Sequence, residues 1–267
     1  MDYITIAVIG NAATFNTLST SRQSQGMCAD ANRGVYAGGY VSGTRTNNIS
    51  YFSIPNFSSN TSFGTLSSAR HSSAGCSDKN RGLFGGGDTG SKVNTIDYVT
   101  IQTVANSTSF GSLTVGRDGL GAVADTTRGL FGGGLALNAS AVCDYVTIAT
   151  TGNATNFGNL TLARLYLAAT ESDTRGVFFG GTIGTTRQTR IDYQVIQTLA
   201  AATTFGTLAT ARSYPAACSN LSRAVLGGGL LAANTATMLY FDIATTGNGT
   251  SFGDLTLART WFAAVSA

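Results

Sequence analysis

A pattern of residues that returns every 47 or 48 positions constrains this chain more than any other feature of its sequence. Each unit contains a Phe, then a Leu three residues later and an Arg seven residues later. The Phe positions are Phe15, Phe63, Phe110, Phe157, Phe205 and Phe252, and the Arg positions that anchor the units are Arg22, Arg70, Arg117, Arg164, Arg212 and Arg259. Because such a period indicates a repeat architecture, we interpret residues 1–267 as a single repeat domain.

Each unit has the pattern of four short strands. The first is small and apolar, as in Leu167-Ala168-Ala169, and the second reads Arg-Gly-Val/Leu-Phe and ends in Gly-Gly. The third carries a Tyr and alternates β-branched residues with Thr, and the fourth runs from the Phe to the Leu. Alternation with a period of two predicts half-buried strands. Four strands in 47–48 residues are typical of one blade of an all-β propeller, in which the repeated Phe residues are expected to be buried between blades.

The last unit is incomplete. The Tyr strand, the Phe strand and the small strand each occur six times, but the Arg-Gly-Gly strand occurs five times. We therefore expect a six-bladed propeller that is closed by its N- and C-termini and whose sixth blade lacks its second strand. The residues expected at this seam are Asp2, Tyr3, Trp261 and Phe262. Three alternatives remain open: the strand is supplied in trans, the chain is truncated, or the two edges collapse into a three-stranded blade.

The order of these residues resembles the kelch repeat over nearly the whole chain. The shared features are Gly-Gly after an apolar strand, a Tyr about a dozen residues later, and then a large aromatic residue, a Leu and an Arg. Phe stands where kelch repeats usually have Trp, and Asp-Tyr opens the third strand in only four units.

The near-identity of units such as residues 152–158 also resembles kelch-like arrays in virion proteins of marine and cyanobacterial phages. This second resemblance implies a phage virion protein, either a decoration protein or a head-fibre or tail-fibre protein that serves host attachment. It implies partners that are other virion proteins or copies of the same chain. The alternative location is extracellular or at the cell surface.

The composition argues against enzymatic chemistry. The chain has one His, His71, and one Glu, Glu171. A Ser-His-Asp triad or a His-containing metal site would have to use His71, and the copper-radical chemistry of some kelch-type propellers needs several His ligands. We therefore predict a protein that is not an enzyme, with no metal and no cofactor.

The charge and the hydropathy of the chain argue against two classes of partner, nucleic acids and membranes. Only two Lys occur, and the other 14 of the 16 basic residues are Arg, most of them at fixed repeat positions rather than clustered as in a nucleic-acid surface. No apolar run approaches the roughly 20 residues of a membrane helix, and the opening MDYITIA lacks the basic region of a signal peptide. We predict neither nucleic-acid nor membrane binding.

Repeated Arg and scattered Cys residues have a structural and a functional interpretation. Six Arg at one phase can crown an axial anion site, but an Arg in every blade more commonly binds neighbouring carbonyls and carboxylates. Asp30, Asp78 and Asp125 stand three residues before their second Arg, around one tight turn.

The four Cys are expected to be free thiols that serve as small packing residues.

The variable loops between the second and third strands carry the candidate binding residues. All differences in repeat length fall in these loops, which are expected to share one face with the connectors between blades. The candidates are Tyr40, Arg45, Asp88, Lys92, Asn138, Arg187 and Arg190. The chain is thus expected to be a non-enzymatic structural or binding module. The alternative to a virion protein is a lectin that binds a surface glycan, with Tyr40, Tyr166 and Tyr214 as stacking surfaces.

Overall fold

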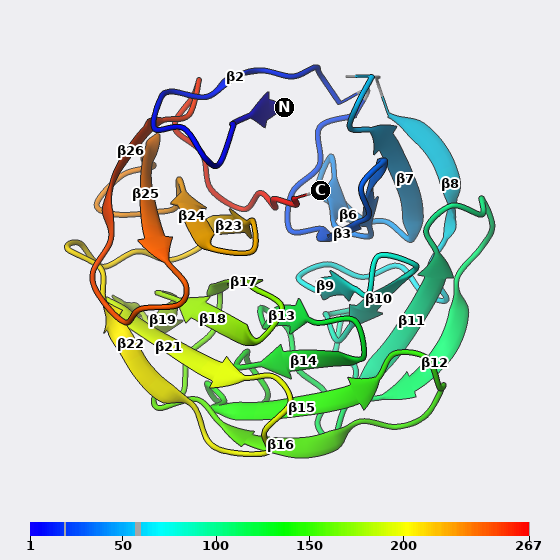
Figure 1. Ribbon diagram of the computed structural model, residues 1–267. Helices are drawn as coiled ribbons and strands as arrows, with labels where there is room; N and C mark the ends of the chain where they lie inside the picture. The colour runs from blue at the N-terminus through cyan, green and yellow to red at the C-terminus, as the bar shows by residue number, and fades with distance from the viewer. Residues whose placement is uncertain (19, 57–59, 267) are drawn as a thin grey trace.

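The computed structural model describes residues 1–18, 20–56 and 60–266 and shows an all-β propeller (Figure 1). Five four-stranded antiparallel sheets surround a central axis, and their first strands lie closest to it. The described residues contain no helix, and accordingly none that is long and apolar enough to cross a membrane. The all-β propeller expected from the repeat is confirmed.

The blades follow the repeat in sequence order. Blade 1 contains β3 (Gly26–Ala29), β4 (Arg33–Ala37), β7 (Asn48–Ser53) and β8 (Thr61–Thr65); blade 2 contains β9 (Ala74–Ser77), β10 (Arg81–Gly85), β11 (Thr95–Thr100) and β12 (Thr108–Ser112). Blade 3 contains β13 (Gly121–Ala124), β14 (Arg128–Gly132), β15 (Val142–Thr147) and β16 (Thr155–Asn159). Blade 4 contains β17 (Ala168–Glu171), β18 (Arg175–Phe179), β21 (Arg190–Val195) and β22 (Thr203–Thr207), and blade 5 contains β23 (Ala216–Ser219), β24 (Arg223–Gly227), β25 (Thr237–Asp242) and β26 (Thr250–Asp254). Two small hairpins project from loops, β5 (Tyr40–Val41) with β6 (Thr44–Arg45) and β19 (Thr182–Ile183) with β20 (Thr186–Arg187).

The hydrophobic core lies between neighbouring blades. One cluster joins Leu83 and Phe110 of blade 2 to Phe131 and Val146 of blade 3, together with Ile148, which follows β15. The second strands are buried because each has a sheet neighbour on both sides and, in blades 2 to 4, another blade on both faces. Glycine in these strands lets the blades approach, since a Cβ on Gly132 would lie 2.8 Å from the Phe178 ring of the next blade.

The expected count of six blades is wrong, because the described chain forms five. β1 (Asp2–Tyr3) and β2 (Ala13–Thr14) pair only with each other, and the segment of residues 259–266 contains no strand. We call residues 1–18 together with residues 259–266 the seam; they lie between blades 5 and 1 (Figure 1). The physical reason is the absent Arg-Gly-Gly strand, which in each blade supplies ladder hydrogen bonds to the first and the third strand at once.

The repeated Phe residues reflect this difference. Five of them are buried, namely Phe63, Phe110, Phe157, Phe205 and Phe252, whereas Phe15 of the seam is only half-buried. Phe15 packs edge-on against Phe52 of blade 1, with ring centroids 5.4 Å apart. The expectation of equivalent burial holds for five of the six.

The anchor Arg residues have the structural role that we favoured. The guanidinium groups of Arg70, Arg117 and Arg164 form buried ion pairs with the Asp of the third strand; Arg117 lies 3.0 Å from Asp144, for example. Arg117 also donates to the carbonyl of Phe131, 2.9 Å away. The acid of the tight turn before the second Arg has another role: Asp125 accepts the backbone N–H groups of Thr127 and Arg128. Arg70, Arg117 and Arg164 thus tie the second strand of their blade to the third.

Candidate ligand site at the axial mouth

The variable loops and the blade connectors meet on one face of the propeller. The residue after each of the first five anchor Arg pairs with the residue after the Gly-Gly of the following second strand, in bridges that join Gln23 to Tyr40, His71 to Asp88, Asp118 to Leu135, Leu165 to Thr182 and Ser213 to Leu230. These bridges place side chains from both segments around the axis. We call this end of the axial channel the mouth.

The mouth is bordered by six residues that each lie two positions after an anchor Arg. All six have a left-handed backbone with φ between 54° and 63°, and they are Ser24, Ser72, Gly119, Tyr166, Tyr214 and Trp261. Five backbone hydrogen bonds of 2.7–2.9 Å link them around the axis. The N–H of Ser24 donates to the carbonyl of Trp261, and the N–H groups of Ser72, Gly119, Tyr166 and Tyr214 each donate to the carbonyl of the residue before it in this set. This series of hydrogen bonds holds the six residues at one level around the axis.

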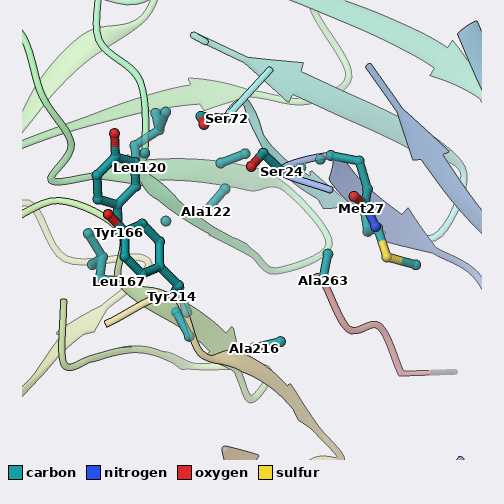
Figure 2. A pocket seen from close by; sticks show the side chains of 18 of the residues that line it. Ser24, Met27, Ser72, Leu120, Ala122, Tyr166, Leu167, Tyr214, Ala216 and Ala263 are labelled. Atoms are coloured by element: carbon teal, nitrogen blue, oxygen red, sulfur yellow. The ribbon is translucent and has the colours of Figure 1, made fainter. Parts of the chain in front are cut away.

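These six positions divide into an aromatic half and a small half. The rings of Tyr214 and Trp261 stack with centroids 3.7 Å apart, and the Tyr166 ring lies 4.4 Å from that of Tyr214. Figure 2 shows the Tyr166 and Tyr214 rings on one side of a pocket and Ser24 and Ser72 on the other. A left-handed backbone costs a non-glycine residue roughly 1–2 kcal/mol. Three bulky residues therefore occupy strained positions that Gly119 fills without strain.

The pocket is an axial cavity of about 150 Å³. Its deeper wall is formed by small residues of the first strands, such as Ala122 and Ala216, and by Met27 (Figure 2). Small residues are required in the first strands because these strands lie close together around the axis. Their small side chains do not fill the space along the axis, and the cavity remains. The cavity is therefore apolar below and aromatic along one rim.

A charged cluster adjoins the small half of the rim. Asp88 lies 3.0 Å from Arg45, 3.4 Å from Lys92 and 3.9 Å from the His71 Nε2 atom. Tyr40 stacks on His71 with ring centroids 4.2 Å apart. The structure thus brings together four of the predicted binding residues, Tyr40, Arg45, Asp88 and Lys92, and adds His71.

The electrostatics of the mouth favour protonated tyrosines. Burial raises the pKa of Tyr166, and the nearby Asp118 carboxylate raises it further. Burial also raises the pKa of Tyr214, although Arg187 opposes this shift. Burial lowers the pKa of His71 more than Asp88 raises it, so His71 is less basic than an ordinary histidine. At neutral pH the rim therefore offers neutral phenol hydroxyls and a neutral imidazole.

The remaining predicted residues are not part of this cluster. Asn138 is exposed in the loop between β14 and β15, and Arg190 donates to the Thr204 hydroxyl across blade 4. Trp261, which we had placed at the seam, belongs to the mouth as well. Tyr166 and Tyr214, which we expected as stacking surfaces, lie at the mouth too, whereas Ser24 and Ser72 were not predicted. The signal for them was present in the repeat: the position two after the anchor Arg reads Ser, Ser, Gly, Tyr, Tyr and Trp in successive units.

A second cavity of about 210 Å³ occupies the opposite end of the channel. Glu171 lies there among turns that carry Asp78, Asp125 and Asp173. Burial raises the pKa of Glu171 to about 8, and Lys79 offsets this shift only in part. Among the described residues, no group of three or more His, Cys, Asp or Glu side chains has a metal-binding arrangement.

Comparison with known proteins identifies no relative: no protein-family model matches the chain, and no curated protein matches it. The resemblances to kelch repeats and to phage virion arrays therefore rest on the residues that carry them. What the structure shows is the β-propeller arrangement, a fold suited to binding and structural roles.

Proposed function

We propose that the protein is a non-enzymatic binding module that holds a carbohydrate at its axial mouth. The observation that carries this proposal is the aromatic half of the rim. Tyr166, Tyr214 and Trp261 hold left-handed conformations that cost stability. Glycine would avoid this strain, as it does in the unit that has Gly119 at the same position. A large aromatic residue at this position in three successive units therefore points to a role beyond packing.

The chemistry of the mouth suits a neutral, polyhydroxylated ligand. The C–H face of a sugar ring stacks on aromatic rings, and Tyr and Trp supply rigid contact area with a polar edge. Across the cavity, the Ser24 and Ser72 side chains offer hydroxyl groups (Figure 2). Arg45 and Lys92 face the two carboxylates of Asp88 and Asp118, so the rim has no strong excess of either sign. The cavity of about 150 Å³ favours a single sugar ring, such as the end of a glycan chain.

The test is binding to a glycan array, followed by calorimetry with the best ligand. We expect Tyr214→Asn to weaken binding at least about tenfold, because Asn tolerates the left-handed backbone but removes the stacking surface. The matched control is Leu137→Ala, since Leu137 is 97% exposed in the loop between β14 and β15 and belongs to no rim contact. An array without any retained glycan, or a ligand that binds the Tyr214→Asn variant as tightly as the parent protein, would contradict the proposal.

We keep a phage virion component, as a decoration or head-fibre or tail-fibre protein, as the second candidate. Its support is the resemblance of the near-identical units to virion arrays and the seam between blades 5 and 1, which offers a place for attachment. The two candidates are compatible, because host attachment often uses glycans. Cosedimentation of the protein with intact phage particles tests this placement, and its absence from purified particles would exclude it.

A further inference from the structure

The two blades beside the seam expose positions that are buried everywhere else in the ring. Leu255, on the blade 5 side, is half-buried, whereas its counterparts Leu66, Leu113, Leu160 and Leu208 are each at most 4% exposed. Ile54, on the blade 1 side, is also half-buried, whereas its counterparts Ile101, Ile148, Ile196 and Ile243 are at most 1% exposed. We call the sides of blades 5 and 1 that face the seam its two walls. Apolar side chains on both walls are thus not covered as they are elsewhere by the second strand of a neighbouring blade.

The contacts inside the complete blades show what provides this cover. Between blades 2 and 3, the Phe131 ring of β14 packs over Gly85 of β10, where an added Cβ would lie 2.6 Å from the ring. At the corresponding Gly227 of β24, the atoms nearest to the same point belong to Met238 and Leu255, and the nearest of them is 3.4 Å away. Between blades 1 and 2, Val35 of β4 packs in one cluster with Ile101. An aromatic residue therefore covers the preceding blade, and the aliphatic residue before it covers the following one.

A polar group at the seam shows the same difference. Arg117 and Arg164 each donate to the carbonyl of the aromatic residue of their second strand, at 2.9 and 3.1 Å. Arg259, the anchor Arg of the seam, pairs with Asp2 at 3.0 Å and donates to Leu257 and Thr256. Within the described ranges it meets no second-strand carbonyl, and its side chain is 27% exposed. Arg259 is therefore placed to donate to the backbone of an added strand.

We propose that the seam binds an extended segment of a partner protein, which inserts as a β-strand between β1 and residues 263–266. The complete blades define its chemistry: an Arg, then Gly, an aliphatic residue, an aromatic residue and Gly, in the order of residues 128–132. The aliphatic residue covers Ile54, the aromatic residue covers Gly227 and Leu255, and the carbonyl of the aromatic residue accepts from Arg259. This is strand addition, in which main-chain hydrogen bonds give affinity and side-chain pockets give specificity. The inference is independent of the ligand at the mouth.

The probe is a synthetic peptide with the sequence of residues 127–134, Thr-Arg-Gly-Leu-Phe-Gly-Gly-Gly. We expect it to bind the whole chain, to raise the midpoint of thermal unfolding by about 5 °C at saturation, and to slow amide exchange in residues 1–5 and 262–266. The same peptide with Phe131→Asp should bind at least about tenfold more weakly, because it places a charge against Gly227 and Leu255.

Variants of the chain locate the binding. Leu255→Arg and Ile54→Arg, one on each wall, should each abolish peptide binding, whereas Leu257→Arg should retain it because Leu257 is 67% exposed and two residues outside the wall. Circular dichroism establishes that each variant is folded, and glycan binding at the mouth should be unchanged in all three. The proposal is overturned if the peptide fails to bind at millimolar concentration. It is equally overturned if exchange slows elsewhere than at the seam, or if a folded variant on either wall binds the peptide like the parent chain.

Discussion

Arg117 and Asp144 form an ion pair in which both side chains are fully buried. Removing two charges from water costs several kcal/mol per ion, and only good pairing with additional hydrogen bonds offsets that cost. Asp144 provides these bonds, since it also accepts from the hydroxyl and the backbone N–H of Thr114. Burial lowers the pKa of Arg117, and Asp144 opposes the shift. At the residue scale, stability thus depends on the hydrogen bonds that accompany a buried ion pair.

Arg117→Met should destabilise the protein by about 3–5 kcal/mol, because it leaves the Asp144 carboxylate buried without its cation. Urea unfolding gives the free energy. The matched control is Arg45→Met, which breaks the partly exposed pair with Asp88 and should cost about 1 kcal/mol or less. A loss below about 1 kcal/mol for Arg117→Met would show that the buried pair is not needed.

Glu171 predicts a pH dependence whose sign follows from its raised pKa. The unfolded chain releases this proton near the ordinary value of 4.5, whereas the folded chain keeps it up to about 8. The contribution of Glu171 to stability is therefore fully present below about pH 4.5 and is lost progressively as the pH rises toward 8. In urea unfolding at about pH 5 and pH 8, Glu171→Gln should remove this part of the decline, and Asp173→Asn, on an exposed neighbour, should not. Parallel pH profiles for Glu171→Gln and the parent protein would contradict the assignment.

The element that repeats is a four-stranded blade whose outer pair carries a bulge. In blade 2 the register between β11 and β12 shifts between Ile96 and Asp97, and the other four blades shift at the equivalent position. In blade 2, Asp97 directly after this shift pairs with the anchor Arg70, and the following Tyr98 packs edge-on against Phe110 of the fourth strand. Each blade is thus a complete unit whose apolar faces need a neighbour.

A blade has either another complete blade or the seam as its neighbour, and the same substitution at equivalent positions compares the two interfaces. Leu113→Ala, in a position 2% exposed between blades 2 and 3, should cost about 2–5 kcal/mol. Leu255→Ala, at the seam, should cost clearly less because the side chain is already half-exposed. Denaturant midpoints measure both. Equal losses would mean that the seam is as well packed as the complete interfaces.

At the scale of the whole molecule, two short segments connect the ring across the seam. Arg223 of β24 donates to the carbonyls of Ile6 and Ala7, each at 3.0 Å, and Gly10 donates to Phe252. These bonds attach the N-terminal segment to blade 5, while Ser24 N–H holds the C-terminal segment at the carbonyl of Trp261. Ring closure therefore depends on two short segments rather than on a complete sheet.

Amide exchange should reveal this unequal distribution of stability. We expect the amides of β1 and β2 to exchange at least about 100-fold faster than those of β14, because a two-residue ladder opens locally without unfolding a blade. Hydrogen exchange read by mass spectrometry separates the two regions. Uniform protection from residue 1 to residue 266 would show that the seam is closed as firmly as the blades.

The repeat in the sequence was sufficient to predict the strands, the all-β propeller and the structural role of the anchor Arg. These features follow from local rules: alternation sets the faces of a strand, and a fixed spacing returns each residue to the same place in the next blade. The shared face of the variable loops followed from the position of the length changes. The Asp partner of the anchor Arg did not, because Asp97 is 27 residues away from Arg70 and only the blade fold joins them.

The tertiary structure alone decided the number of blades and the composition of the mouth. Six copies of three strand types suggested six blades, but β1 and residues 259–266 form no common sheet, because a first and a third strand pair only through the second strand between them. Tyr166, Tyr214 and Trp261 come from three successive units and meet because the propeller turns their connectors toward one axis. The sequence thus determined the repeated unit, whereas ring closure, which depends on contacts between distant ends of the chain, determined where that repetition stops and which side chains face each other across the axis.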